Sequence, residues 1–140
     1  MPSVTHTFAR RYEADPESVG RARAELACFA SRAGASQRLV DGLRLAVSEA
    51  VTNVVRHAYP VDPGEIRVRA LAGEDGLEVV VSDDGCGVHR DRADDSGLGF
   101  GLALICELSD QMTLAPRSGG GTEVRMRFSL SGSGAAVGRL

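Results

Sequence analysis

The chain has 140 residues, of which 43% are hydrophobic and 25% are charged, and this composition is typical of one soluble globular domain with a single core. Its net charge of -3 argues against nucleic acid as a direct partner, because binding to phosphates needs clustered positive charge. No run approaches the ~20 apolar residues that span a bilayer, and the N-terminus has no signal-peptide core. Three widely spaced cysteines fit neither a disulfide framework nor a zinc site, so we expect a cytoplasmic protein without membrane contact.

The first half of the chain has mostly helical patterns. Residues 5–12 alternate weakly between polar and apolar side chains, which is typical of an edge strand. The Asp-Pro pair at 15–16 begins a helix that ends before Gly34. Ser36 then provides the N-cap of a second helix, which ends before Pro60.

The second half of the chain has mostly strand patterns. Alternating or continuous apolar runs predict four strands, at residues 65–71, 77–82, 111–115 and 122–130. A charged loop over residues 88–96 and an apolar helix over residues 102–108 lie between the second and third of these strands. Hairpin spacing predicts mostly antiparallel pairing, and helices with one apolar face each are best buried together. The sequence thus predicts an α/β (α+β) two-layer sandwich over residues 1–130, in which a mixed, mostly antiparallel sheet has about three helices on one face, followed by a flexible tail over 131–140.

The second helix presents a line of polar side chains beside its apolar stripe. Glu49, Asn53 and His57 each lie one turn apart, so all three point off one face. A carboxylate and a carboxamide placed in this way suit a hard cation and a proton that has to be moved. Taken alone, the line fits the solvated face of an ordinary amphipathic helix better, and the other motifs must decide.

Asp83 ends the continuously apolar strand and begins an Asp-x-Gly-x-Gly motif. Gly85 and Gly87 let the backbone turn sharply and approach a ligand closely. A buried, ionised carboxylate accepts hydrogen bonds and donates none, so it pairs with the exocyclic amine of adenine and repels the carbonyl of guanine. These residues are therefore a candidate adenine pocket that selects ATP over GTP. The competing interpretation is a plain Asp-Gly turn after a strand.

Two further glycine motifs follow. Gly97, Gly99 and Gly101 lead directly into the last predicted helix, where free backbone N–H groups form an anion site. Thr122 follows a pair of glycines, and its hydroxyl is placed to support Asp83 or a water in the base pocket. Each motif also fits a simpler interpretation, as a solvated loop and as a hairpin turn.

The order of these four motifs, between Leu45 and Phe128, resembles the GHKL ATPase superfamily, whose N, G1, G2 and G3 boxes lie on the Bergerat, or histidine-kinase-like, fold. The segment VSEAVTNVVRHAYP, the short chain and the two-helix start are similar to the anti-sigma factor serine kinases of the RsbW and SpoIIAB type. In contrast, the segment GLGFGLALI is closer to sensor histidine kinases.

The resemblance implies a role for each motif residue. Asn53 would hold Mg²⁺, which bridges the phosphates of ATP. Glu49 would be the general base that takes the proton from an attacking hydroxyl, and Asp83 would read the adenine amine. The other positions implied to bind the nucleotide are Gly85, Gly87, Gly97, Gly99, Gly101 and Thr122.

The resemblance also implies an activity and partners. It implies a protein-serine kinase that uses ATP to phosphorylate a STAS-domain anti-anti-sigma factor and that sequesters a sigma factor. Members of the family often form homodimers through the N-terminal strand and the nearby helix, so residues 5–12 are the candidate dimer edge. Two alternatives stay open: a nucleotide-dependent anti-sigma binding switch with little kinase activity, and a stand-alone histidine-kinase-like ATPase domain.

Overall fold

The computed structural model describes residues 4–59, 64–85, 105 and 107–129. The long helices and the strands in these ranges are, in chain order, β1 (Val4–Glu13), α1 (Pro16–Arg32), α2 (Gln37–His57), β2 (Glu65–Gly73), β3 (Gly76–Asp83), β4 (Gln111–Pro116) and β5 (Thr122–Ser129). Ile105, Glu107 and Leu108 are also helical, at the position of the last predicted helix. The rest of that helix lies outside the described residues, as do the predicted loop and tail. No described helix has the combination of length and apolar composition that crossing a membrane requires.

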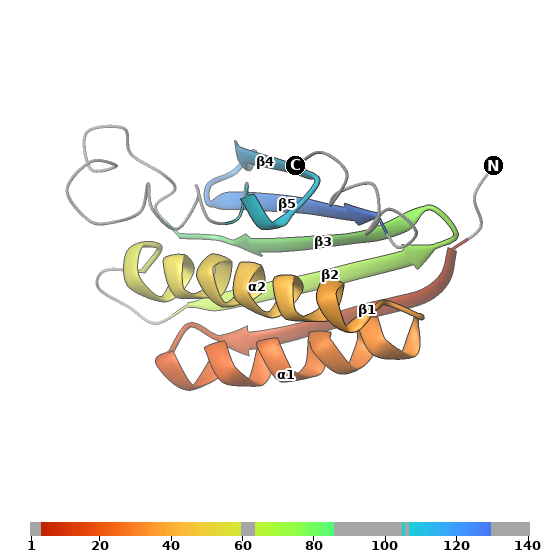
Figure 1. Ribbon diagram of the computed structural model, residues 1–140. Helices are drawn as coiled ribbons and strands as arrows, with labels where there is room; N and C mark the ends of the chain where they lie inside the picture. Colours follow the sequence, from red (N-terminus) through yellow and green to blue (C-terminus); the bar gives the residue numbers. More distant parts are fainter. Residues whose placement is uncertain (1–3, 60–63, 86–104, 106, 130–140) are drawn as a thin grey trace.

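The strands form one sheet in the order β1-β2-β3-β5-β4 (Figure 1). Every pairing among the described strands is antiparallel, so the described part of the predicted mixed, mostly antiparallel sheet has no parallel component. β3 is the middle strand, as its continuous apolar run predicts. β5, the last strand along the chain, lies between β3 and β4.

Both long helices lie on the same face of the sheet (Figure 1), which confirms the predicted two-layer sandwich. The stripe of α2 that periodicity predicts to be apolar is fully or almost fully buried, and it consists of Leu43, Val47, Ala50, Val51 and Val54. The buried residues of the corresponding stripe of α1 are Ala22, Leu26 and Ala30. Val19 and Phe29, which follow the same helical spacing, pack against the core but are only partly buried.

Local capping signals set the helix boundaries. The side chain of Asp15 accepts a hydrogen bond from the N–H of Ser18 at 3.0 Å, and that of Ser36 accepts one from the N–H of Leu39 at 3.1 Å. Each such cap stabilises a helix by about 1 kcal/mol. Gly34 has a φ of 98°, in the left-handed region that ends many helices, and α1 stops just before it. The predicted starts and ends of both helices are therefore confirmed.

Alternation along the strands gives the sheet two different faces. The side chains under the helices are apolar, as predicted, and from β2 and β5 they are Ile66, Val68, Ala70, Ala72, Val124, Met126 and Phe128. We call the face opposite α1 and α2 the open face, and the charged side chains that its strands carry are Arg11, Glu13, Glu65, Arg67, Arg69, Glu78, Glu123, Arg125 and Arg127. The candidate site uses both faces at one end of β3.

Candidate functional site

Asp83 is the last residue of β3, and its side chain lies on the helix-covered face. In the β2–β3 ladder it is opposite the buried Ile66, so the two side chains share a face. Only 4% of Asp83 is exposed. Its Oδ1 accepts a hydrogen bond from the N–H of Gly85 at 2.8 Å, and the backbone N–H of Thr122 lies close enough to the same carboxylate to lower its pKa. A carboxylate has about four lone-pair positions, so the group still has capacity for a donor on a ligand.

The electrostatic environment of Asp83 favours such a donor. Burial raises the pKa of Asp83 above its usual range, and the N–H groups of Gly85 and Thr122 lower it only in part. Burial has this effect because it removes water from the charged form. An ionised carboxylate in this position is short of stabilising partners, and a ligand that donates a hydrogen bond to it gains affinity.

Two glycines bring three segments into contact at this end of the sheet. A Cβ on Gly85 would collide with the carbonyl oxygen of Ala58, which is the C-cap of α2. A Cβ on Gly121 would collide with the carbonyl oxygen of Asp83, and Gly121 has a φ of 93° that disfavours any side chain. The end of α2, the end of β3 and the turn before β5 therefore meet directly, and each close approach requires glycine.

Glu49 and Asn53 project from α2, which runs away from this meeting point. Ala58 touches Gly85, so Asn53 lies five residues, or about 7.5 Å of helix rise, from the contact. Glu49 is one turn, or about 6 Å, farther along. Both side chains are partly exposed. A ligand that is bound at one end by Asp83 and extends along α2 toward its N-terminus would therefore meet Asn53 first and Glu49 second.

The side-chain amide of Asn53 has an open end. Its Nδ2 atom is buried and has no hydrogen-bond partner among the described residues. A buried polar atom without a partner costs about 1–3 kcal/mol, so such atoms normally mark a place where something else binds. The oxygen and nitrogen of a carboxamide exchange on a half-turn, so the open end can also present the oxygen that Mg²⁺ prefers. Asn53 therefore fits the metal ion that the resemblance implies.

The structure tests the placement of some predicted site residues and leaves others aside. Asp83, Gly85 and Thr122 lie in direct contact, and Glu49 and Asn53 lie on the helix whose end touches Gly85. The backbone N–H of Thr122 lowers the pKa of Asp83, and the predicted role of the Thr122 hydroxyl stays a prediction. The predicted site residues outside the described ranges are Gly87, Gly97, Gly99 and Gly101.

Sequence reasoning missed a charged cluster next to the site. Asp84 accepts two hydrogen bonds from Arg67, at 2.9 Å and 2.8 Å, and also pairs with Arg117. Arg117 in addition donates to the backbone carbonyl of Asp83 at 3.0 Å. The one signal in the sequence was the alternation of side chains along a strand. Asp84 directly follows an inward-facing residue, so its side chain is expected on the outer face of the sheet, where Arg67 also lies.

Comparison with known proteins identifies the class first. The family described as the Histidine kinase-like ATPase domain matches residues 12–128, which include every described residue of the site. The chain belongs to this family of ATPase domains, and ATP is therefore the nucleotide that its site uses.

Two relatives and one solved structure narrow the assignment. A serine-protein kinase RsbW from Listeria monocytogenes is 40% identical over 129 residues, which cover 81% of this chain and 82% of that protein. Another RsbW from the same species is 52% identical over 86 residues, or 61% of this chain, but the match spans only 55% of its length. The crystal structure of the RsbU and RsbW domains of Rv1364c from Mycobacterium tuberculosis has a TM-score of 0.71 at 26% identity, over 90% of this chain and 33% of that one. The chain is a member of the RsbW serine-protein kinase family.

Proposed function

We propose that the protein is an ATP-dependent protein-serine kinase and an anti-sigma factor. It transfers the γ-phosphate of ATP to a serine of a STAS-domain anti-anti-sigma factor, and it sequesters a sigma factor when that acceptor is not bound. The observation that carries the proposal is the position of the buried Asp83 carboxylate at the end of the helix that carries Asn53 and Glu49. Both partners act on transcription, so we expect the protein in the cytoplasm.

Asp83 selects the base. Its carboxylate receives the exocyclic amine of adenine, while guanine would present a carbonyl oxygen to it and leave both acceptors unpaired. The backbone N–H groups of Gly85 and Thr122 hold the carboxylate in place. Gly85 also allows the end of β3 to pack directly against the end of α2, because a side chain at this position would collide with the carbonyl of Ala58.

Asn53 binds the phosphate end through Mg²⁺. Its amide, which has no hydrogen-bond partner among the described residues, would hold the ion through its oxygen, the ligand type that Mg²⁺ prefers. The ion supplies charge neutralisation for the transferred phosphoryl group. The task of this chain is to hold Asn53 at a fixed distance from the adenine pocket, and the contact of Gly85 with the end of α2 does so.

Glu49 moves the proton. The serine hydroxyl of the acceptor attacks the γ-phosphorus, a new O–P bond forms, and the bond to the β-phosphate oxygen breaks as ADP leaves with the electron pair. The carboxylate of Glu49 takes the proton of the hydroxyl. One turn of α2 separates Glu49 from Asn53, so the base and the metal ligand face the same ligand.

The decisive experiment is transfer of label from γ-³²P-ATP with Mg²⁺ to a candidate STAS-domain protein. We expect label on one serine of the acceptor, release of ADP, and no transfer when that serine is replaced by alanine. A protein that binds ATP and the acceptor but transfers no label would contradict the kinase assignment and support the binding switch instead. The matched control is Glu74→Gln, a substitution in the exposed β2–β3 turn that leaves transfer unchanged.

A further inference from the structure

We propose that Arg67, Asp84 and Arg117 form a clamp that positions Asp83 to read the adenine base. The inference rests on the proposed ATP-binding function and adds specificity-determining residues that do not touch the nucleotide. The three clamp residues come from β2, from the residue after β3 and from the turn between β4 and β5. They lie on the open face, on the other side of the sheet from the Asp83 carboxylate.

The clamp and Tyr59 together hold one peptide group at both of its ends. The carbonyl oxygen of Asp83 accepts a hydrogen bond from Arg117 at 3.0 Å. The N–H of Asp84, which belongs to the same peptide group, donates to the hydroxyl of Tyr59 at 2.8 Å. A peptide group fixed at its oxygen and its nitrogen fixes the ψ angle of Asp83 and the φ angle of Asp84. The direction in which Asp83 presents its carboxylate is fixed with them.

Each arm of the clamp is itself anchored. The guanidinium of Arg67 binds the Asp84 carboxylate with two parallel hydrogen bonds, the geometry in which arginine pairs most specifically. The hydroxyl of Tyr59 donates a hydrogen bond to the carbonyl of Glu65 at 2.7 Å, which ties the end of α2 to the start of β2. The turn that carries Arg117 is closed by a hydrogen bond from its N–H to the carbonyl of Gly121 at 3.1 Å.

Asp84 keeps its negative charge to a lower pH than Asp83 does, because the pKa values of the two residues are shifted in opposite directions. Hydrogen bonds from Arg67 and then from Arg117 hold the pKa of Asp84 well below its usual range. Burial shifts the pKa of Asp83 in the opposite direction. The clamp therefore stays ionised over the whole pH range in which the base-reading carboxylate gains its proton.

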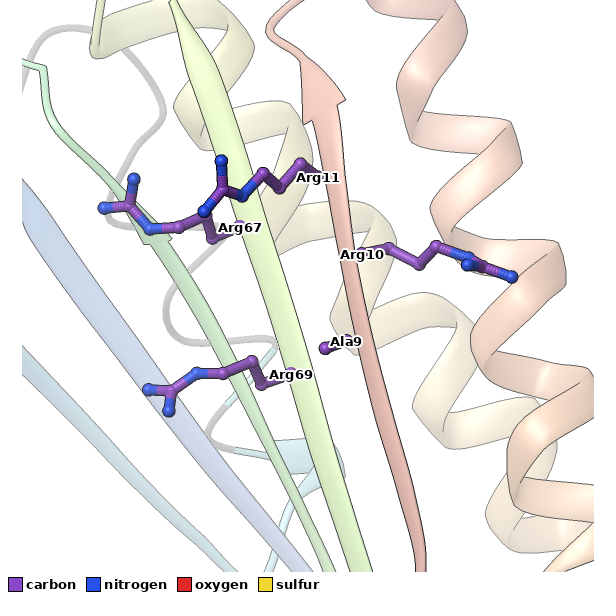
Figure 2. A pocket seen from close by; sticks show the side chains of 5 residues that line it. All are labelled: Ala9, Arg10, Arg11, Arg67 and Arg69. Atoms are coloured by element: carbon purple, nitrogen blue, oxygen red, sulfur yellow. The ribbon is translucent and has the colours of Figure 1, made fainter.

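Arg69 offers a matched control on the same strand and face. It lies two residues after Arg67 in β2, and its side chain is exposed. No ion pair within the described ranges includes it. A shallow groove of about 360 Å³ on β1 and β2 is lined by Ala9, Arg10, Arg11, Arg67 and Arg69 (Figure 2). The figure shows Arg67 and Arg69 extending from the same side of β2, whereas Arg10 points the other way, toward α1.

The test compares three variants of the full chain, Arg117→Gln, Asp84→Asn and Arg69→Gln. Titration with Mg·ATP and with Mg·GTP gives the two dissociation constants, and thermal unfolding shows that each variant is folded. We expect the Kd for ATP to rise roughly three- to tenfold in the two clamp variants, since the lost charge-assisted bonds are strong but partly exposed. The Kd for GTP stays the same, so the preference for ATP shrinks, and Arg69→Gln behaves as the unaltered protein.

The outcomes separate this inference from the proposed function. Clamp variants that bind ATP normally, or that lose ATP and GTP binding to the same degree because part of the protein is unfolded, would overturn the clamp. Asp83→Asn is measured in parallel. If it weakens ATP binding while the clamp variants do not, only the clamp fails, and if it leaves ATP binding unchanged, the base-reading role of Asp83 fails first.

Discussion

Asp83 and Asp84 are consecutive residues, but they belong to two regions with opposite properties. Asp83 lies under the helices, is almost fully buried, and has a pKa raised by that burial. Asp84 lies on the open face and has a pKa lowered by Arg67 and Arg117. The region under the helices leaves its polar groups incompletely paired, so a ligand can complete them. On the open face, Asp84 pairs with Arg67 and Arg117 within the protein, and this cluster holds the backbone.

The comparison extends along α2. Asn53, like Asp83, has hydrogen-bonding capacity that no described residue uses, and it lies on the same side of the sheet. If this division is correct, substitutions under the helices change chemistry and affinity. Substitutions in the clamp on the open face change only how well the site is held.

The largest effect is expected for Glu49→Gln. Glutamine keeps the size of the side chain but cannot take a proton, so the kcat of phosphoryl transfer falls by about 10²–10⁴ while ATP affinity is kept. Single-turnover transfer to the acceptor measures kcat, and Ser48→Ala is the control on the same helix. Retained transfer by the Gln variant would remove Glu49 as the base.

Asp83→Asn tests the base pocket. Loss of the negative charge weakens the hydrogen bond to the adenine amine, so the Kd for ATP rises roughly 10- to 100-fold. The Kd for GTP changes little, because guanine has no donor at that position. Asp75→Asn, in the exposed β2–β3 turn, serves as control. Comparable binding of ATP and GTP by the unaltered protein would already contradict the assignment.

Asn53→Ala tests the metal end. Loss of one oxygen ligand lowers the affinity for Mg·ATP by about tenfold, since one such contact contributes about 1.4 kcal/mol. Metal-free ATP binds equally to the variant and the unaltered protein. Titrations with Mg²⁺ and with EDTA measure both quantities, and an unchanged response to Mg²⁺ would show that another residue holds the ion.

The smallest effect is a pH dependence of ATP affinity. Protonated Asp83 accepts the hydrogen bond of the adenine amine more weakly than the ionised form does, so affinity falls as the pH drops through its raised pKa. The fall begins at a higher pH than the ordinary aspartate value of about 3.9 would give. Asp84, with its lowered pKa, stays charged over this range. The measurement is the Kd for ATP of the unaltered protein and of Asp83→Asn, from pH 7 downward. We expect the ratio of the two Kd values to shrink by about a few-fold as the pH falls. A difference independent of pH would contradict it.

The fold was predictable because its signals are local. The caps at Asp15 and Ser36, the left-handed Gly34 and the alternation along β2 each depend on a few neighbouring residues, and the structure confirms them. The order of the four motifs was equally visible in the sequence, and it predicted the family of ATPase domains to which the chain belongs.

The charged cluster was not predictable because it depends on register. Arg67 and Asp84 are seventeen residues apart, and they meet only because Arg67 lies opposite Ser82 in the β2–β3 ladder. Arg117 reaches the same carboxylate from thirty-three residues away. The position of the Thr122 N–H beside Asp83 likewise depends on how closely Gly121 approaches β3, which residue types alone do not encode.

The position of β5 between β3 and β4 determines when the domain can be finished during synthesis. A nascent chain that has already formed the β1–β2–β3 meander still exposes one edge of β3, and β4 has no strand to pair with. Both wait until β5 has left the ribosome, and Thr122 of the proposed base pocket arrives with it. In the proposed binding mode ATP stabilises only the completed protein, and until then the half-made sheet exposes an unpaired strand edge.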